Sequence, residues 1–301
     1  MNEIQIYSPE EELYDPLFAE KEIRVSLKRD DMIHPFISGN KWRKLKLNIQ
    51  EAKENEKDHL VTFGGVWSNH LLATACAAAR YGLKSTAFVR GEDINSDVLV
   101  LCRMFGMHLI FTDRSAYRDK KGLYEAKFSK DPKSVFIDEG GAGHNAMQGC
   151  AEIISELNQP YDHLFCAAGT GTTFAGLVKG TRDASLNTCC HCIPVLKGAD
   201  FLKEEINAYF DTPPSYRFHN QYSFGGYAKT TNELLRFIGQ FTSRTGILLD
   251  PIYTGKMMFA LYDLIRNDHF AKGSTILAVH TGGLFGLLGM KELITAVLKG
   301  N

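Results

Sequence analysis

The sequence HLFCAAGTGTT, from His163 to Thr173, joins a short apolar segment to the start of a helical pattern through a glycine loop. Gly169 and Gly171 allow the backbone to approach an anion closely, and the threonines beside them add hydroxyl donors. The helix start offers free N–H groups and the positive end of the helix dipole. This stretch therefore predicts a strand, a turn and a helix, with a phosphate site at the carboxyl end of the strand.

Two common nucleotide-binding motifs do not match this loop. No Gly-Lys followed by Ser or Thr is present, so it is not a Walker loop. The dinucleotide fingerprint matches only in part, because the third small residue is displaced to Ala175-Gly176 and no convincing acidic residue follows the next strand. We therefore expect the phosphate of a mononucleotide-sized ligand.

Short apolar segments alternate with longer helical patterns along the chain. This alternation is typical of an α/β fold with mostly parallel sheets and helices on both faces. The predicted strands are Ile23–Leu27, His59–Phe63, Ser85–Val89, His108–Phe111, Ser134–Ile137, His163–Ala167, Thr188–Ile193 and Thr275–His280. The predicted helices are Lys41–Lys53, Asn69–Tyr81, Asp97–Phe105, Asn145–Leu157, Thr172–Thr181, Phe201–Ala208, Thr231–Thr245, Gly255–Asn267 and Leu284–Leu298.

Glycines follow four of the predicted strands. In parallel sheets, ligands bind beyond the carboxyl ends of the strands. Glycine is common in any loop, so one such position is weak evidence, but four at equivalent places predict one extended cleft. The four segments are Gly64-Gly65, Gly140-Gly141, Gly169 with Gly171, and Gly282-Gly283.

Lys41 lies in the sequence SGNKWRKL, residues 38–45, where a loop meets a predicted helix. A lysine amine can bind a carbonyl cofactor when burial or neighbouring cations lower its pKa, and Arg43 and Lys44 are near in sequence. The competing interpretation is a solvated basic helix face. We favour a cofactor lysine, because the preceding Ser-Gly-Asn gives the backbone the freedom to enter a cleft.

The sequence GGVWSNH, residues 64–70, connects a predicted strand to an alanine-rich helix. Ser68 and Asn69 are good N-cap residues, which is a structural role. The free N–H groups of the same helix start could also bind a substrate carboxylate. The two roles are compatible.

The composition argues against several kinds of partner. With 34 basic and 35 acidic residues the formal net charge is −1, which gives no basis for a nucleic-acid or membrane-surface partner. The first residues show no secretory signal pattern, and no apolar run is long enough to span a bilayer. The seven scattered cysteines suit a reducing cytoplasm better than a disulfide framework, so we expect a cytoplasmic protein.

The sequence CCHC, residues 189–192, contains residue types that bind zinc. Zinc ligands usually form pairs with two- to four-residue gaps, and a second pair lies elsewhere. Here the residues are contiguous and no second Cys/His pair lies nearby in the sequence. We expect a buried strand rich in small thiols and no metal.

Five motifs follow one another between residues 38 and 283: GNKWRKL from Gly39, GGVWSNH from Gly64, GTGT from Gly169, DPIYTGK from Asp250 and HTGG from His280. In this order they resemble the D-cysteine desulfhydrase and 1-aminocyclopropane-1-carboxylate deaminase family of pyridoxal-phosphate enzymes. That family has the tryptophan-synthase-β-like fold, known as fold type II. Gly226-Tyr227 matches a further family tyrosine.

The resemblance implies pyridoxal 5′-phosphate as the cofactor. Lys41 would bind it covalently and then move the α-proton of the substrate, and Asn69 would hydrogen-bond its phenolic oxygen. Tyr253 would lie against the pyridine ring and Thr254 would face the ring nitrogen, while Thr281 would either contact the same region or only cap its loop. The phosphate would be held by Gly169, Thr170, Gly171 and Thr172.

The resemblance also implies how the substrate is held. Ser68 and His70, next to Asn69, would bind the substrate carboxylate, with Ser68 close to the reacting carbon. Tyr227 would lie near the substrate, although either family tyrosine could instead be a core residue with a satisfied hydroxyl. Trp67 stands where the family usually has a polar residue, and would narrow the mouth of the carboxylate site.

Two threonines bear on the reaction. In the deaminase branch the residue after the tyrosine is typically glutamate, which keeps the pyridine nitrogen protonated and strengthens the electron sink. The position of Thr281 is typically leucine in that branch. Threonine at both positions, 254 and 281, therefore resembles the desulfhydrase branch.

We expect a lyase that eliminates the β-substituent of a small amino acid, D-cysteine first, to give pyruvate and ammonia. The alternatives are 1-aminocyclopropane-1-carboxylate deaminase and a cofactor-binding homologue with little turnover. The resemblance implies a homodimer and two α/β domains with the cofactor between them. We predict a small domain over residues 44–147, inserted in a large domain formed by residues 1–43 and 148–301.

Overall fold

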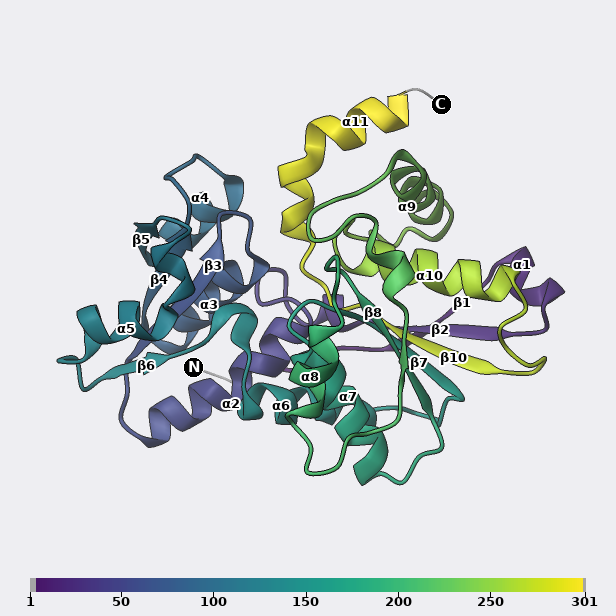
Figure 1. Ribbon diagram of the computed structural model, residues 1–301, viewed down its shortest axis with the longest axis horizontal. Helices are drawn as coiled ribbons and strands as arrows, with labels where there is room; N and C mark the ends of the chain where they lie inside the picture. Colours follow the sequence, from purple (N-terminus) through teal and green to yellow (C-terminus); the bar gives the residue numbers. More distant parts are fainter. Residues whose placement is uncertain (1–3, 300–301) are drawn as a thin grey trace.

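The computed structural model describes residues 4–299, which contain two sheets flanked by helices (Figure 1). In strand order, the six-stranded sheet comprises β1 (Glu10–Leu13), β2 (Arg24–Lys28), β10 (Thr275–Val279), β7 (His163–Ala168), β8 (Cys189–Pro194) and β9 (Arg217–Phe218). The four-stranded sheet comprises β5 (His108–Thr112), β4 (Lys84–Arg90), β3 (His59–Gly65) and β6 (Ser134–Phe136).

Within residues 4–299, every neighbouring pair of strands is parallel except β1 with β2. The predicted α/β class with two mostly parallel sheets is therefore confirmed. All the predicted strands are present, with ends displaced by one or two residues at most. The sequence analysis missed β1, because three of its four residues are glutamate and only Leu13 is buried.

Helices connect the strands and cover the sheets. They are α1 (Pro16–Glu20), α2 (Asn40–Glu54), α3 (Asn69–Tyr81), α4 (Asp97–Met104), α5 (Lys120–Phe128), α6 (His144–Ser155), α7 (Thr172–Asp183), α8 (Phe201–Asn207), α9 (Asn232–Thr245), α10 (Thr254–Arg266) and α11 (Lys291–Lys299). Short 3₁₀ turns lie at Asp30–Met32, Ala116–Arg118, Glu139–Gly141, Asn220–Ser223 and Leu284–Met290.

One predicted helix is wrong in its extent. The prediction Leu284–Leu298 divides into a 3₁₀ segment up to Met290 and α11 after it. The first part contains Gly286 and Gly289, and glycine is a poor residue for an α-helix interior. The sequence analysis also missed α1, α5 and the short β9.

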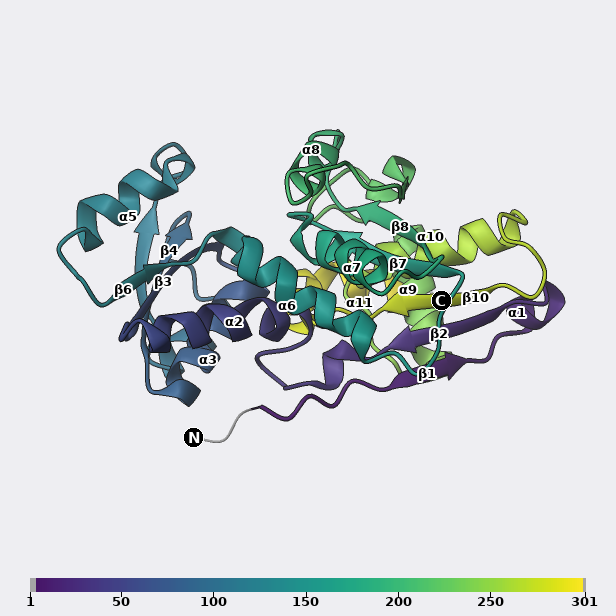
Figure 2. The same cartoon turned by 90° about the horizontal axis from the view of Figure 1, so that it is seen from below.

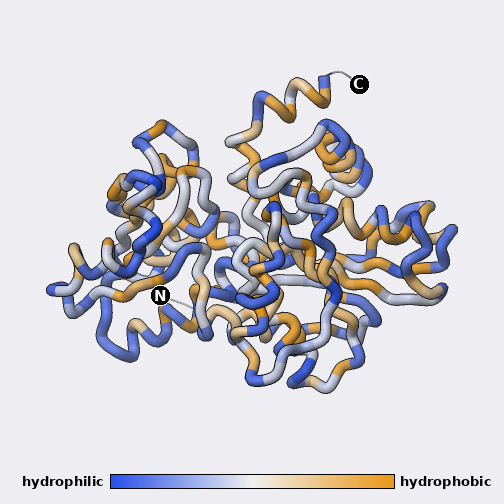
Figure 3. The backbone as a smooth tube through the Cα atoms, in the orientation of Figure 1, coloured by the Kyte–Doolittle hydropathy of each residue, from blue (hydrophilic) through white to orange (hydrophobic). Residues whose placement is uncertain are grey.

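Both faces of the six-stranded sheet are buried, as the apolar strands predict. Phe165 of β7 packs with residues of α9 and α10, whereas its neighbours Leu164 and Cys166 pack with residues of α6 and α7. Successive residues of a strand point to opposite faces, so the sheet separates two hydrophobic cores. In contrast to these buried strands, the outer helix α11 has both hydrophobic and hydrophilic residues along its length (Figure 3).

Helices α2 and α6 pack against each other where the two sheets approach (Figure 2). A Cβ on Gly149 of α6 would lie 2.1 Å from the carbonyl oxygen of Arg43, so only glycine allows this contact. The small sheet is formed within residues 59–136, and the strands of the large sheet come before and after it. The domain boundaries at residues 43/44 and 147/148 remain a prediction. None of the helices within residues 4–299 has the length and apolar character needed to cross a bilayer.

Candidate active site

A cavity of about 810 Å³ lies where the carboxyl ends of strands from both sheets meet the starts of α2, α3 and α7. It is the extended cleft that the strand-end glycines predict. The predicted site residues that line it are Lys41, Trp67, Ser68, Asn69, His70, Gly169, Thr170, Gly171, Tyr227, Tyr253 and Thr281.

Lys41 lies in the first turn of α2, and its Nζ is 3.5 Å from the carbonyl oxygen of Gly140. Burial of the amine, with the charge of Lys44 as a second cause, lowers its pKa from 10.5 to about 7. At neutral pH a large fraction of Lys41 is therefore an unprotonated amine, the form that reacts with an aldehyde. The basic sequence around Lys41 is thus not a solvated helix face.

A close backbone contact fixes the start of α2. Gly39 has φ +60°, and a Cβ there would lie 1.9 Å from the carbonyl oxygen of Thr281. The N–H of Asn40 donates to the same oxygen at 3.2 Å. The lysine loop is therefore built directly on the residues that follow β10.

The glycine loop before α7 has the geometry of an anion site. Gly171 is the N-cap with φ +75°, and no side chain caps the helix, so the first N–H groups of α7 are available to a ligand. A Cβ on Gly171 would meet Ile206 at 2.8 Å, so the turn requires glycine. Thr170 lines the cavity. Thr172 does not line it, because its hydroxyl pairs with Tyr209 at 3.0 Å.

Two residues at this loop, Lys44 and Asn40, were not assigned to the phosphate site from the sequence. The Nζ of Lys44 lies 3.0 Å from the Gly140 carbonyl oxygen and 3.4 Å from the Thr170 hydroxyl. Asn40 donates from Nδ2 to the hydroxyl of Thr173 at 2.9 Å. Lys44 follows Lys41 by three residues, so both lie on one face of α2, and this spacing could have identified it.

The start of α3 offers both donors and an unpaired acceptor. Ser68 caps the helix, since its Oγ accepts from the N–H of Leu71. Asn69 donates from Nδ2 to the carbonyl oxygen of Gly283 at 2.6 Å, while its buried Oδ1 has no partner among the described residues. A buried polar atom without a partner costs stability, so this atom marks a place for a ligand.

In this structure the imidazole of His70 is neutral: its Nε2 carries the proton and its Nδ1 is the acceptor. The Thr62 hydroxyl donates to the carbonyl oxygen of Ile137, so His70 must donate from Nε2 to that hydroxyl, 2.7 Å away. Its Nδ1 is then an unpaired lone pair. Burial, with the charges of Lys41 and Lys44, lowers the pKa of His70 well below its usual value. The imidazole of His70 therefore has no free N–H to donate to a substrate carboxylate. Only the backbone N–H of His70 could make that hydrogen bond.

Two tyrosines close the other side of the cavity. The rings of Tyr227 and Tyr253 meet edge to face, with centroids 6.1 Å apart. A Cβ on Gly169 would lie 3.0 Å from the ring of Tyr253, so the ring packs directly on the glycine loop. Burial, with Tyr227 as a second cause, raises the pKa of Tyr253 well above its usual value, so the hydroxyl stays protonated. Tyr253 is thus a cavity residue as well as a packing residue.

A family model described as pyridoxal-phosphate dependent enzyme matches residues 12–282 of this chain. The chain belongs to this family of pyridoxal-phosphate enzymes. Its cofactor is pyridoxal 5′-phosphate, and the cavity has the groups that this molecule needs: a low-pKa amine, an anion loop with a facing cation, and an amide oxygen without a partner among the described residues.

Individual relatives agree with this assignment. The chain is 30% identical to the bifunctional D-cysteine desulfhydrase/1-aminocyclopropane-1-carboxylate deaminase of Arabidopsis thaliana, across 91% of this chain and 76% of that protein. It is 27% identical to a D-cysteine desulfhydrase of Yersinia enterocolitica, across 86% of each chain. The crystal structure of an ACC deaminase homologue superposes with a TM-score of 0.86 at 28% identity, covering 98% of this chain and 94% of that one.

Thr254 does not reach the cofactor cavity of this pyridoxal-phosphate enzyme. It is fully buried, its hydroxyl donates to a carboxylate oxygen of Asp250 at 2.7 Å, and it accepts from the Asp250 N–H. The same carboxylate accepts from the N–H groups of Ile252 and Tyr253, which forms a tight turn before α10. The expectation that Thr254 faces the pyridine nitrogen is therefore not met, whereas Thr281 does line the cavity.

Trp67 forms part of the cavity wall beside the 3₁₀ segment after β10. A Cβ on Gly289 would lie 2.8 Å from its indole ring, so the ring packs on the glycine backbone. Arg90 and Arg114 also line the cavity, near the residues of the predicted carboxylate site. The sequence analysis gave no role to these arginines, since arginines at strand ends are common on protein surfaces.

Proposed function

We propose that this chain eliminates the β-substituent of a small D-amino acid, with D-cysteine as the leading substrate. The products would be pyruvate, ammonia and hydrogen sulfide. The observation that supports this best is a pair of groups on one cavity: the Lys41 amine, whose pKa burial lowers to about 7, and the Tyr253 hydroxyl, whose pKa burial raises well above its usual value. An environment that moves two pKa values in opposite directions is typical of an acid–base pair.

Bound pyridoxal phosphate supplies an electron sink for charge at the substrate's α-carbon. Lys41 would accept the α-proton at Nζ, as its low pKa allows. The free N–H groups at the start of α3 and the hydroxyl of Ser68 would hold the substrate carboxylate. This would fix which face of the substrate's α-carbon is turned towards Lys41. The protonated hydroxyl of Tyr253 would hydrogen-bond the leaving group. Tyr227 beside it, half exposed, would exclude water on the open side.

Within the same proposal, the cofactor is held along the cavity. Gly169, Thr170, Gly171 and Lys44 would hold the phosphate, and Asn69 would orient the phenolic oxygen. Thr172 would contribute its backbone N–H, because its hydroxyl is paired elsewhere. Thr281 lines the cavity and would approach the ring nitrogen. A neutral hydroxyl there would suit an elimination that needs only a moderate electron sink.

The second candidate is 1-aminocyclopropane-1-carboxylate deaminase. It is favoured by the names of the Arabidopsis relative and of the structural neighbour. Ring opening of the cyclopropane acid would yield 2-oxobutanoate and ammonia. A third candidate is a homologue that binds the cofactor but turns over little substrate.

One assay separates these three candidates. The purified holoenzyme is supplied in turn with D-cysteine, L-cysteine, β-chloro-D-alanine, D-serine and the cyclopropane acid, and the oxo acid is identified. We expect pyruvate from D-cysteine and from β-chloro-D-alanine. Exclusive formation of 2-oxobutanoate from the cyclopropane acid would overturn the elimination proposal, and absence of any oxo acid would support the binding homologue.

We further propose that the protein works as a homodimer in the cytoplasm. The dimer is an implication of the family resemblance, and the seven scattered cysteines suit a reducing cytoplasm. Light scattering of the purified holoenzyme tests the dimer directly, because a molar mass of a single chain at micromolar concentration would contradict it.

A further inference from the structure

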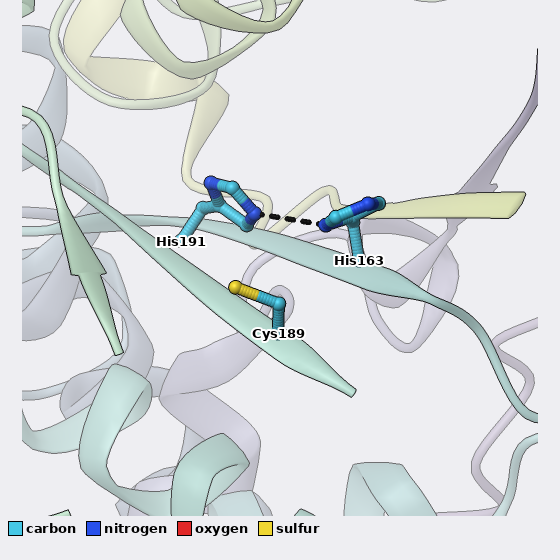
Figure 4. Close-up of side chains that lie close together, drawn as sticks. All are labelled: His163, Cys189 and His191. Atoms are coloured by element: carbon cyan, nitrogen blue, oxygen red, sulfur yellow. Dashed lines mark hydrogen bonds between the residues drawn. The ribbon is translucent and has the colours of Figure 1, made fainter. Parts of the chain in front are cut away.

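A second cluster of reactive side chains lies outside the cofactor cavity, at the start of two neighbouring strands. His163 is the first residue of β7, and Cys189 and His191 belong to β8. In the parallel register His163 lies opposite Cys189. Side chains two positions apart in a strand point to the same face, so His191 lies on the same face of the sheet as Cys189 and His163. Figure 4 shows the two imidazoles facing each other with the thiol beside them.

The distances within this cluster suit a shared ion. Nδ1 of His163 and Nε2 of His191 are 3.1 Å apart. One ring nitrogen of each histidine and the sulfur of Cys189 all lie within 4.8 Å of one another. Ligands about 2.0–2.3 Å from a tetrahedral zinc ion are separated by roughly 3.3–3.7 Å, so small side-chain rotations would bring all three atoms onto one ion.

His219 holds His191 in the orientation that such an ion requires. Its Nε2 lies 2.9 Å from Nδ1 of His191. If Nδ1 of His191 donates its proton to His219, then Nε2 of His191 presents its lone pair towards His163. In metal sites the other ring N–H of a histidine ligand is usually held by an acceptor that fixes the tautomer, and His219 would be that acceptor here.

We propose that His163, Cys189 and His191 form a binding site for a divalent ion of the zinc type. One thiolate and two imidazoles are the donors that zinc prefers, and a water molecule would complete four-fold coordination. Binding would release the thiol proton of Cys189. The expectation of a metal-free thiol strand rested on the absence of a second Cys/His pair in the sequence, but the adjacent strand β7 provides His163.

The surroundings allow an ion to enter this site. His163 and Cys189 are partly exposed, whereas His191 is buried, so the site opens on the side of the first two residues. The charges nearby are of opposite sign, Asp162 beside His163 and Arg217 beside His191. These two charges balance each other. The thiolate of Cys189 would therefore give the pocket a net negative charge, which favours binding of a cation.

The position of the site separates it from catalysis. His163 and Cys189 begin their strands, whereas the cofactor cavity lies beyond the carboxyl ends of the strands. The ion would join β7 to β8 and would not contact pyridoxal phosphate. The expected effect is on the stability of the large sheet, and the proposal does not depend on which amino acid the enzyme uses.

The experiment uses the holoenzyme after removal of metal with a chelator. Equilibrium dialysis with Zn²⁺ should give one bound ion per chain. Replacement by Co²⁺ should give an intense thiolate-to-metal charge-transfer band together with the visible bands of tetrahedral cobalt. The absorbance of the cofactor should not change. Absence of the charge-transfer band in the wild-type protein would overturn the proposal, since the coordination includes Cys189.

Variants of the cluster provide the second test. Cys189→Ser and His163→Gln should each weaken Zn²⁺ binding by more than about 100-fold, and His219→Gln by about 10- to 100-fold through loss of the tautomer contact. His108→Gln, an exposed histidine at the start of β5, is the matched control and should bind Zn²⁺ like the wild type. Equal Zn²⁺ affinity in the wild type and in Cys189→Ser would contradict the site.

Discussion

The Nζ of Lys44 lies 3.4 Å from the hydroxyl oxygen of Thr170, so a cation from α2 reaches the glycine loop that begins α7. Replacing Lys44 by Ala would remove the charge-assisted contact that we propose between Lys44 and the phosphate, worth about 1.5–3 kcal/mol. We expect the affinity of the apoprotein for pyridoxal phosphate to fall by about 10- to 100-fold.

The control for this change is Lys46→Ala. Lys46 is two residues further along α2 and pairs with Glu152 outside the cavity. Fluorescence titration of both apoproteins with the cofactor measures the difference. Equal weakening in the two variants would mean that Lys44 does not contact the phosphate.

The low pKa of Lys41 predicts how covalent cofactor uptake depends on pH. Burial, helped by Lys44, lowers this pKa to about 7, so the reactive amine is depleted below pH 7 and nearly complete above pH 8. The rate of the absorbance change on mixing apoprotein with pyridoxal phosphate should rise through pH 7 and then level off. In Lys44→Met the midpoint should move to higher pH, because a repelling charge is lost. A rate that still rises steeply at pH 9–10 would indicate an ordinary lysine.

The same shift affects the stability of the apoprotein. In the unfolded chain Lys41 has its ordinary pKa near 10.5, so between pH 7 and 10.5 the unfolded state binds more protons than the folded state. The contribution of Lys41 to the free energy of unfolding therefore rises with pH across this window. Replacing Lys41 by Met should remove that part of the pH dependence, as urea titrations at several pH values would reveal, and should abolish the covalent absorbance.

Gly39→Ala should disrupt the site without disrupting the fold of either sheet. The new Cβ would meet the Thr281 carbonyl oxygen at 1.9 Å, so the lysine loop or the residues after β10 must move. Gly106→Ala is the control, because Gly106 has a similar positive φ of 80° and nothing lies within 4 Å of its added Cβ. Both variants lose about 1–2 kcal/mol from backbone strain, but only Gly39→Ala should lose covalent cofactor binding. Retained binding in Gly39→Ala would contradict this contact.

Arg43→Met should cost much more stability than removal of a surface ion pair. Arg43 is fully buried and pairs with the buried Asp30 and with Glu156 at the end of α6. Removal of one partner leaves Asp30 as an uncompensated buried charge, at a cost of about 3–5 kcal/mol. Lys46→Met, which breaks the partly exposed pair with Glu152, should cost no more than about 1 kcal/mol. Denaturant unfolding of the two variants provides the comparison, and similar losses would be inconsistent with the buried network.

Trp67→Ala should change which substrate is preferred. The indole lies on Gly289 and forms part of the cavity wall, so its removal widens the site. We expect the ratio of kcat/KM for an S-alkyl-D-cysteine to that for D-cysteine to rise by about tenfold or more. An unchanged ratio would indicate that Trp67 only supports the structure.

Where the sequence analysis succeeded, local chemistry agrees with the tertiary structure. Both ends of Asn69–Tyr81 were predicted, because Ser68 caps the first turn and Gly82 ends the last with φ 70°. The glycine loop and Lys41 were found for a similar reason, since close approach and a helix start leave clear sequence signals. The prediction over Leu284–Leu298 failed because apolar periodicity continues through the two glycines that break the helix.

Where it failed, the deciding contact is not evident from the sequence motif alone. Thr254 was expected at the cofactor because it follows Tyr253, but the Asp250 carboxylate captures its hydroxyl within a tight turn. Thr172 belongs to the glycine motif, yet Tyr209 pairs with its hydroxyl. His163 could not be associated with Cys189 from spacing alone, because only the parallel register places them opposite each other.

The contact between the lysine loop and the residues after β10 also bears on how the protein acquires its cofactor during synthesis. The Ser38 hydroxyl accepts from the N–H of Gly283, 245 positions further along the chain. A nascent chain on the ribosome therefore has Lys41 long before it has the backbone that holds Lys41 in place. Cofactor loading must wait until the last strand has emerged and paired, so a truncated chain lacking that strand would be recognisable by its lack of colour.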